Sequence, residues 1–139
     1  MLNEVGIRQM INGPIPITAD GEPIIGLSPE LDNFYLCCGF TSGIAASGGA
    51  GWVMANWIVD GDPGMDLWPF DVRRFGAPHS VKDLMYARAV ESYSRYYHIA
   101  WPAYEAEAGR DARRSPLHAV LKAAGAVYGN KFGWERPNW

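Results

Sequence analysis

Residues 38–51 read CGFTSGIAASGGAG, a run of small residues between two apolar segments. The segment before it, residues 34–38, is short, aromatic and apolar, which predicts a buried strand. The segment after it, residues 52–59, predicts a helix with an apolar face that ends at Asp60 and Gly61. A glycine-rich turn between them leaves backbone N–H groups free to meet an electron-rich ligand atom. Tight packing of the helix on a sheet, without a ligand, is the alternative that the spacing leaves open.

Bulk composition places the chain among ordinary globular proteins. It has 139 residues, of which 48% are hydrophobic and 19% are charged, enough for one domain or two small subdomains. The net charge of −3, without any block of like charges, argues against nucleic acid and anionic membranes as partners. No apolar run is long enough to span a membrane. The start of the sequence lacks the basic flank and apolar core of a signal peptide.

The two cysteines are neighbours, Cys37 and Cys38. On a strand their side chains point to opposite faces, so neither a mutual disulfide nor a shared metal ion is expected. We therefore predict buried free thiols in a reducing compartment, which favours a cytoplasmic location.

The first sixty residues contain three short strand signals. Residues 6–11 alternate between apolar and polar side chains, and residues 24–27 form a second apolar run before the strand at 34–38. Turn residues separate these runs at 12–14 and at 20–23. The clearest change of composition is DGDPG at residues 60–64. We therefore predict one unit over residues 1–62 and another over residues 63–139.

The second unit is predicted to mix helices with a terminal hairpin. Residues 65–75 look extended, and a helix is expected from Ser80, as its N-cap, to about His98. A polar connection at 105–114 leads to a short helix opened by Ser115 and Pro116 and ending at Ala124. Residues 125–129 and 131–134 indicate a terminal strand or a hairpin. The whole pattern predicts an α+β fold. The apolar face of the long helix would be formed by Val81, Leu84, Met85, Val90, Tyr93, Tyr96 and Tyr97.

Few side chains form a recognisable reactive centre. His79, His98 and His118 are far apart, and none has metal-like spacing with Cys, Asp or Glu. No nucleophile-elbow, Walker or opening dinucleotide-binding motif is present. His118 with Arg113 and Arg114 at a helix N-terminus suggests an anion site. A structural histidine beside surface arginines is the alternative reading.

An ordered series of motifs resembles a known family. The segments NGP (12–14), TADGEPIIG (18–26), CGFTSGI (38–44) and SGGAG (47–51) resemble the last part of a flavin-dependent amine oxidoreductase domain. The branch they are most similar to contains the dimethylglycine and sarcosine dehydrogenases. The segments DVRRF (71–75), RRSPLH (113–118) and GWERPNW (133–139) resemble the central domain of the same branch. The resemblance covers essentially the whole chain.

The resemblance implies a site for FAD at the glycine-rich turn. The backbone of residues 41–44 would stabilise negative charge that develops at the N1/O2 edge of the flavin. Two departures from the branch are a threonine at 41, where asparagine is common, and a turn one residue shorter. Alanines at 45–46, where related oxidases place a lysine, favour a dehydrogenase. The implied cofactor-binding residues are Thr18, Gly39, Phe40, Thr41, Ser42, Gly43 and Ile44.

The implied function is part of an FAD-dependent oxidoreductase that oxidises small N-methylated glycine-type amines. Hydride transfer from an N-methyl or α-carbon to the flavin would yield an iminium ion. The chain would be inactive alone, needing a flavin-domain chain or self-association, and tetrahydrofolate would belong to the full-length relative. Two alternatives stay open: a stand-alone, non-catalytic protein-binding module, and an accessory subunit of folate-linked one-carbon metabolism.

Overall fold

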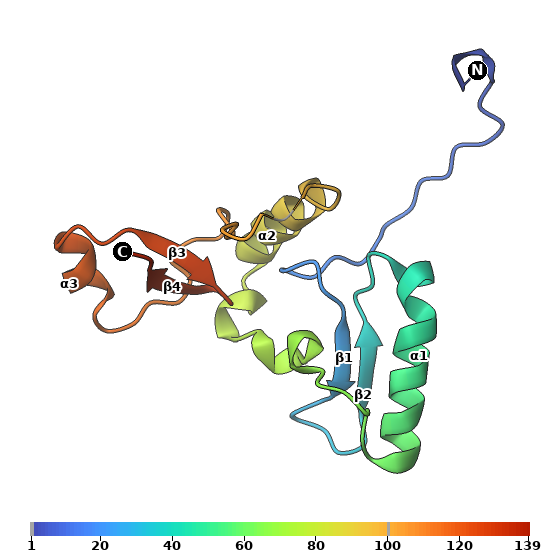
Figure 1. The fold of residues 1–139 in the computed structure, drawn as a ribbon, viewed down its shortest axis with the longest axis horizontal. Helices are drawn as coiled ribbons and strands as arrows, with labels where there is room; N and C mark the ends of the chain where they lie inside the picture. Colours follow the sequence, from blue (N-terminus) through green and yellow to red (C-terminus); the bar gives the residue numbers. More distant parts are fainter. Residues whose placement is uncertain (1, 100) are drawn as a thin grey trace.

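The computed structural model describes residues 2–99 and 101–139. Two antiparallel hairpins lie at opposite ends, with α2 and several short 3-10 helices between them (Figure 1). This mixture of short strands and a few helices confirms the predicted α+β class. The elements in chain order are η1 (Leu2–Glu4), β1 (Ile24–Leu27), β2 (Tyr35–Cys38), α1 (Gly43–Asp60), η2 (Trp68–Phe70), η3 (Val72–Arg74), η4 (Ala77–Ser80), α2 (Lys82–Ser94), α3 (His118–Ala123), β3 (Tyr128–Lys131) and β4 (Trp134–Pro137).

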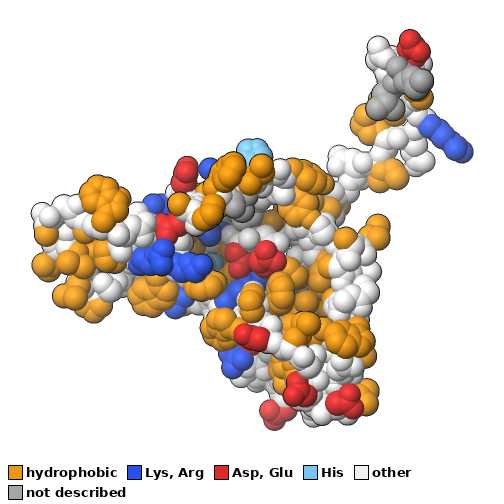
Figure 2. Space-filling model, in the orientation of Figure 1, with side chains coloured by type: hydrophobic (Ala, Val, Ile, Leu, Met, Phe, Trp, Pro, Cys, Tyr) orange, Lys and Arg blue, Asp and Glu red, His pale blue; other side chains and the backbone are white. Residues whose placement is uncertain are grey.

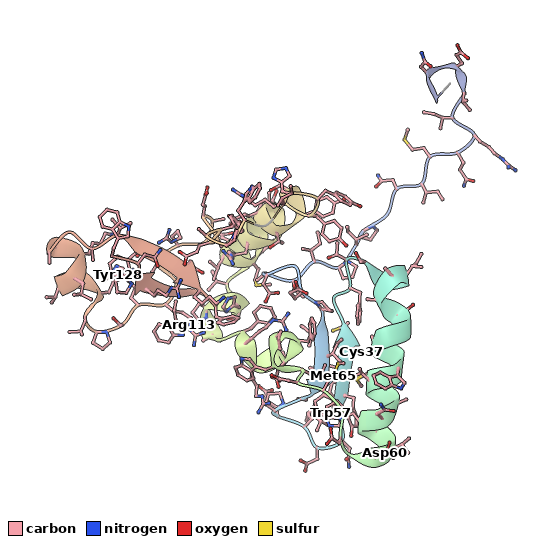
Figure 3. The ribbon with its side chains drawn as sticks, viewed as in Figure 1. Cys37, Trp57, Asp60, Met65, Arg113 and Tyr128 are labelled. Carbon is pink, nitrogen blue, oxygen red and sulfur yellow. The ribbon has the colours of Figure 1, made fainter. Side chains whose placement is uncertain are left out.

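The first hairpin packs one face against α1. Strands β1 and β2 pair from Ile24 opposite Cys38 to Leu27 opposite Tyr35, and α1 runs alongside them (Figure 1). Trp57, on the hairpin side of α1 (Figure 3), meets Tyr35 edge-on with ring centroids 6.2 Å apart, a favourable aromatic geometry. The buried cluster between these elements consists of Ile25, Ala50, Val53, Met54 and Leu67.

Helix α1 is longer at its N-terminus than the sequence suggested. It begins at Gly43 rather than near Trp52, so the later glycines lie inside the helix and only residues 39–42 form the turn. The glycines in this stretch disfavour helix, and the burial of Ala50, Val53 and Met54 in the apolar cluster supplies the packing that stabilises it. The predicted C-terminus is confirmed, because α1 ends at Asp60 and Gly61 follows in the left-handed conformation at φ 77°.

Two predictions about the first hairpin region were wrong. Residues 6–11 form no strand, and their apolar side chains are exposed. They lie along a segment that extends away from the rest of the chain (Figure 1), so no neighbouring strand completes a ladder. Strand β2 is not buried either. Cys37 and Cys38 are free, as predicted, but both are exposed, because they lie at the end of a strand that has only one neighbouring strand.

The middle of the chain is more helical and less buried than predicted. Residues 68–74 form η2 and η3 instead of an extended segment; Pro69 and the Asp71 side chain, which accepts from the Arg73 N–H at 2.7 Å, favour these turns. Helix α2 is confirmed between Lys82 and Ser94, but Ser80 belongs to η4 and is not its N-cap. None of its residues is buried, so its predicted core face lies open or half-open.

The C-terminal hairpin is confirmed. Strands β3 and β4 pair from Tyr128 opposite Pro137 to Lys131 opposite Trp134. The preceding helix α3 begins at His118, three residues later than its predicted opening at Ser115. Within the described parts of the chain, no helix combines the length and the hydropathy that crossing a membrane requires.

Candidate functional site

The turn between β2 and α1 depends on Gly39. This residue has φ +74°, a backbone conformation that side chains other than glycine rarely adopt. A Cβ on Gly39 would lie 2.8 Å from the Cγ2 methyl of Thr18, closer than such atoms approach. Thr18 and the start of the turn are therefore in direct contact, which agrees with their grouping from the sequence.

Thr18 is buried at the start of a tight polar loop. Its hydroxyl hydrogen-bonds to the Glu22 carbonyl oxygen at 2.7 Å and lies 3.0 Å from Oδ1 of Asp20. The same Oδ1 accepts from the Glu22 N–H at 3.1 Å, and the Gly21 N–H donates to the Thr18 carbonyl. An aspartate that binds backbone groups two residues ahead is a common way to close such a turn. The loop thus holds the Thr18 methyl in a fixed place beneath the turn.

The N-terminus of α1 is open. Ser42 occupies the N-cap position, yet its side chain makes no capping hydrogen bond, and Ser42, Gly43 and Ile44 are all exposed. The first backbone N–H groups of a helix have no intrahelical partner, and the dipole of this 18-residue helix concentrates positive charge there. An electron-rich, planar edge can therefore approach the backbone of residues 42–44 without displacing a side-chain cap.

An apolar cavity adjoins this turn. Its volume is about 620 Å³, and Phe40 and Thr41 from the turn line it together with Ala46, Gly49 and Trp52 from α1. Small side chains on α1 leave this space open, and Phe40 also packs against the buried cluster. The cavity provides an apolar wall immediately beside the open helix N-terminus.

The structure brings most of the predicted residues together in one place. Thr18, Gly39 and Phe40 form the support of the turn, while Thr41 and the backbone of residues 42–44 form its accessible edge. The Ile44 side chain is 97% exposed and contributes only its backbone to this edge. These placements fit a planar, electron-rich cofactor. The flavin contacts themselves stay a prediction.

Sequence reasoning missed the residues that hold the loop from the other half of the chain. The local pattern indicates only a turn residue at Asp20, but its carboxylate also pairs with the buried Arg74 at 2.7 Å. Arg74 lies in the DVRRF segment, whose resemblance to a central domain gives its arginines no role. The available signal was the pair of arginines beside apolar residues. An arginine that is buried with such residues requires a carboxylate partner, which would have suggested a search for one elsewhere in the chain.

The suggested anion site around His118 is occupied by a side chain of the protein. Asp111 Oδ1 lies 3.5 Å from His118 Nε2 and 3.7 Å from Arg114 Nε. Arg113 turns elsewhere, with its guanidinium 4.6 Å from the centre of the Trp134 ring. His118 is buried and packs against Tyr128 with ring centroids 4.3 Å apart, and neither of its ring nitrogens has a hydrogen-bond partner among the described residues. The sequence did not predict Asp111 as the carboxylate at this position.

Comparisons with known proteins agree with the resemblance. Residues 60–115 match the FAD dependent oxidoreductase central domain. The chain is 42% identical over its full length to mouse sarcosine dehydrogenase and 34% identical to mouse dimethylglycine dehydrogenase, of which it covers 15% and 16%. It is also 34% identical over 99% of its length to the mouse pyruvate dehydrogenase phosphatase regulatory subunit, covering 16% of it.

The chain spans about one sixth of the length of these relatives. All three are named as mitochondrial proteins, whereas the cytoplasmic location of this chain stays a prediction. The division at residues 62 and 63 also stays a prediction. Residues 60–115 are thus similar to the FAD dependent oxidoreductase central domain, and the chain as a whole is homologous to one stretch of the sarcosine and dimethylglycine dehydrogenases.

Proposed function

We propose that this chain forms one wall of the flavin site in an FAD-dependent oxidoreductase that oxidises N-methylated glycine-type amines. The observation that carries the proposal is the uncapped N-terminus of α1, which stands beside an apolar cavity and is supported by Gly39 and Thr18. Homology to sarcosine and dimethylglycine dehydrogenases supports the substrate class, because both names denote N-methylated glycines.

FAD, when bound, supplies the two-electron acceptor for oxidation of the amine. The residues of this chain provide a fixed electrostatic environment for it. The N–H groups of residues 42–44 and the positive end of α1 favour negative charge at the adjoining edge of the ring. Phe40 and the apolar side chains of the cavity exclude water from that side, which strengthens the same interactions.

We also propose that the outer face of α1 is covered by the remainder of a flavin domain. Helix α1 is apolar on several sides, and Ile44, Trp52, Ile58 and Val59 are all exposed. Hydrophobic side chains are spread widely over the visible face of the molecule (Figure 2). A helix that is apolar all round normally lies inside a larger core. The partner is a flavin-domain segment or, failing that, a second copy of this chain.

A variant of the turn tests the flavin proposal directly. Gly43→Val places a side chain at the first helical position, where a Cβ lies 3.8 Å from the Phe40 Cβ and so fits. We expect the flavin-loaded protein that contains this chain to lose FAD affinity or shift its flavin potential. Gly13→Val is the matched control, because Gly13 is exposed and a Cβ added there would meet no atom within 4 Å. Unchanged flavin spectrum and turnover of dimethylglycine or sarcosine in Gly43→Val would refute the proposed contact.

A second function has one specific observation in its favour. The homologous pyruvate dehydrogenase phosphatase regulatory subunit has a name that describes regulation of another protein and not amine oxidation. A non-catalytic protein-binding role is therefore the alternative, and an accessory role in folate-linked one-carbon metabolism is weaker. Native purification of the chain with its partners separates these functions. Co-purifying flavin absorbance supports the oxidoreductase, and a stable but colourless complex supports the binding module.

A further inference from the structure

Arg74 forms the strongest polar connection between the two halves of the chain. Its side chain is only 1% exposed. Nε donates to Asp20 Oδ2 at 2.7 Å, and Nη2 donates to Asp20 Oδ1 at 3.1 Å and to the Glu22 carbonyl at 2.8 Å. Nη1 donates to the Asp71 carbonyl at 3.2 Å, and the guanidinium carbon lies 4.2 Å from the centre of the Phe75 ring. Several donors of the guanidinium are therefore used, and its plane is fixed.

The two acceptors of Arg74 in the loop are the same two groups that hold Thr18. Asp20 Oδ1 and the Glu22 carbonyl both lie within hydrogen-bonding distance of the Thr18 hydroxyl. The methyl group of Thr18 in turn lies against Gly39 so closely that no Cβ fits between them. A continuous series of contacts thus leads from Arg74 through Asp20 and Thr18 to the first residue of the turn.

We infer that Arg74 is a positioning residue for the flavin-contacting turn. The inference rests on the function proposed above and extends it, because it assigns to the central-domain half a part in shaping the flavin site. Arg74 holds the carboxylate of Asp20 in a bidentate geometry, and Asp20 holds the rotamer of Thr18. The Thr18 methyl group, in contact with Gly39, then sets the position of the backbone at the start of the turn. Geometry that must be held closely is usually supported in this way by a second layer of hydrogen bonds.

Lysine cannot replace arginine in this arrangement. A guanidinium binds two carboxylate oxygens and a carbonyl in one plane, whereas an ammonium group binds as a point charge. Helix α2 adds a second connection from the same half, because the Ser92 hydroxyl donates to the Ala19 carbonyl at 3.3 Å. The loop therefore stays attached to this half of the chain when the planar contact of Arg74 is lost, but the Asp20 carboxylate is no longer held in one orientation. Arg74→Lys tests this orientation without removing the positive charge.

The experiment uses the flavin-loaded polypeptide or complex that contains this chain, and FAD as the ligand. Arg74→Lys and Thr18→Val are made singly and together; the valine keeps the methyl group against Gly39 and removes the hydroxyl. We expect each single variant to raise the FAD dissociation constant about fivefold to tenfold and to shift the flavin absorption spectrum. The double variant is expected to have the same FAD dissociation constant as the single variant that binds FAD less tightly, because both changes interrupt the same series of contacts.

Arg73→Lys is the matched control. Arg73 is on the same short helix, is mainly exposed, and pairs with Asp71 instead of the loop. The FAD affinity and flavin spectrum of the Arg73→Lys variant should therefore equal those of the parent protein. Asp20→Asn replaces Arg74→Lys if the latter does not fold. Multiplicative effects in the double variant, or an Arg74→Lys spectrum and affinity equal to those of Arg73→Lys, would overturn the inference. A parent protein that binds no FAD would instead refute the proposed function on which it rests.

Discussion

The β1–β2 hairpin packs a small apolar cluster against α1, whereas the β3–β4 hairpin folds around one buried carboxylate. In the first, contact between Ile25 and the inner face of α1 supplies the cohesion. In the second, Glu135 accepts from Arg110 Nε at 2.9 Å, from the Asp111 N–H at 2.8 Å and from the Asn130 amide at 3.4 Å. Arg110 also donates to the carbonyl of Tyr128, which ties the connecting segment to β3.

This difference shows which end of the molecule satisfies a buried charge within the described residues. The donors around Glu135 all come from this chain, so that hairpin needs no partner to satisfy its buried charge. The outer face of α1 has no such complement, because its apolar side chains are exposed to solvent. The site at the N-terminus of α1 therefore lies at the end where the partner proposed above would pack.

Removing the buried charge tests the self-contained end most severely. Glu135→Gln leaves Arg110 without its carboxylate and weakens the hydrogen bonds from Arg110, Asp111 and Asn130. We expect a loss of about 2–3 kcal/mol in the free energy of unfolding, at the low end for a broken buried pair because Arg110 is partly exposed. Urea denaturation measures the loss. Glu107→Gln, whose side chain is 78% exposed, is the control and should change stability by less than about 0.5 kcal/mol. Equal stability of the two variants would contradict the assigned role of Glu135.

The same carboxylate predicts a dependence of stability on pH. Hydrogen bonds from Arg110 lower the pKa of Glu135 from 4.5 to about 2. The folded state thus holds the proton less tightly than the unfolded state. The resulting stabilisation is present above pH 4.5 and is lost as the pH falls from 4.5 towards 2. It amounts to about 3 kcal/mol at most.

Denaturation of the parent and of Glu135→Gln between pH 6 and about 2 isolates this contribution from that of other carboxylates. The difference in unfolding free energy between the two proteins should shrink as the pH falls. A difference that stays constant over this range would show that the Glu135 carboxylate does not carry the stabilisation.

The two strands of the first hairpin, the C-terminal hairpin and the end of α1 were predicted from local patterns because their signals are local. Gly61 stops α1, and turn residues bound the apolar runs that form β1 and β2. The open strand β2 and the absent strand at residues 6–11 were not predictable in this way. Whether an apolar strand is buried depends on a neighbour that its own sequence does not encode.

The candidate site was predictable in part for the same reason. The glycine-rich turn and Thr18 were identified from a family resemblance, and the structure places them in contact. The ion pair of Asp20 with Arg74 spans 54 positions of sequence, and no spacing rule reveals such a pair. The carboxylate Asp111 beside His118 was missed because the local pattern of arginines indicated an external anion.

A substitution at the turn tests the uncovered end. Gly39→Ala forces an alanine into a backbone with φ +74° and places its Cβ 2.8 Å from Thr18. We expect a loss of about 1–2 kcal/mol in unfolding free energy, measured by urea denaturation. Gly13→Ala, in an open and extended segment, should have almost no effect. Equal stabilities would show that the backbone of the turn readjusts and that Gly39 is not required for its shape.

The smallest expected change in unfolding free energy tests whether a partner packs on α1. Gly48 lies in the interior of α1 and is exposed, and a Cβ added there would meet no atom within 4 Å. Gly48→Ala should therefore stabilise the isolated chain by about 0.5–1 kcal/mol, because alanine favours helix over glycine. If a flavin domain packs closely on this face, the same methyl group meets it, and the gain should vanish or reverse in the assembled protein. Thermal unfolding of both forms measures this sign change. A gain of equal size in both would mean that the glycines of α1 do not make room for a neighbour.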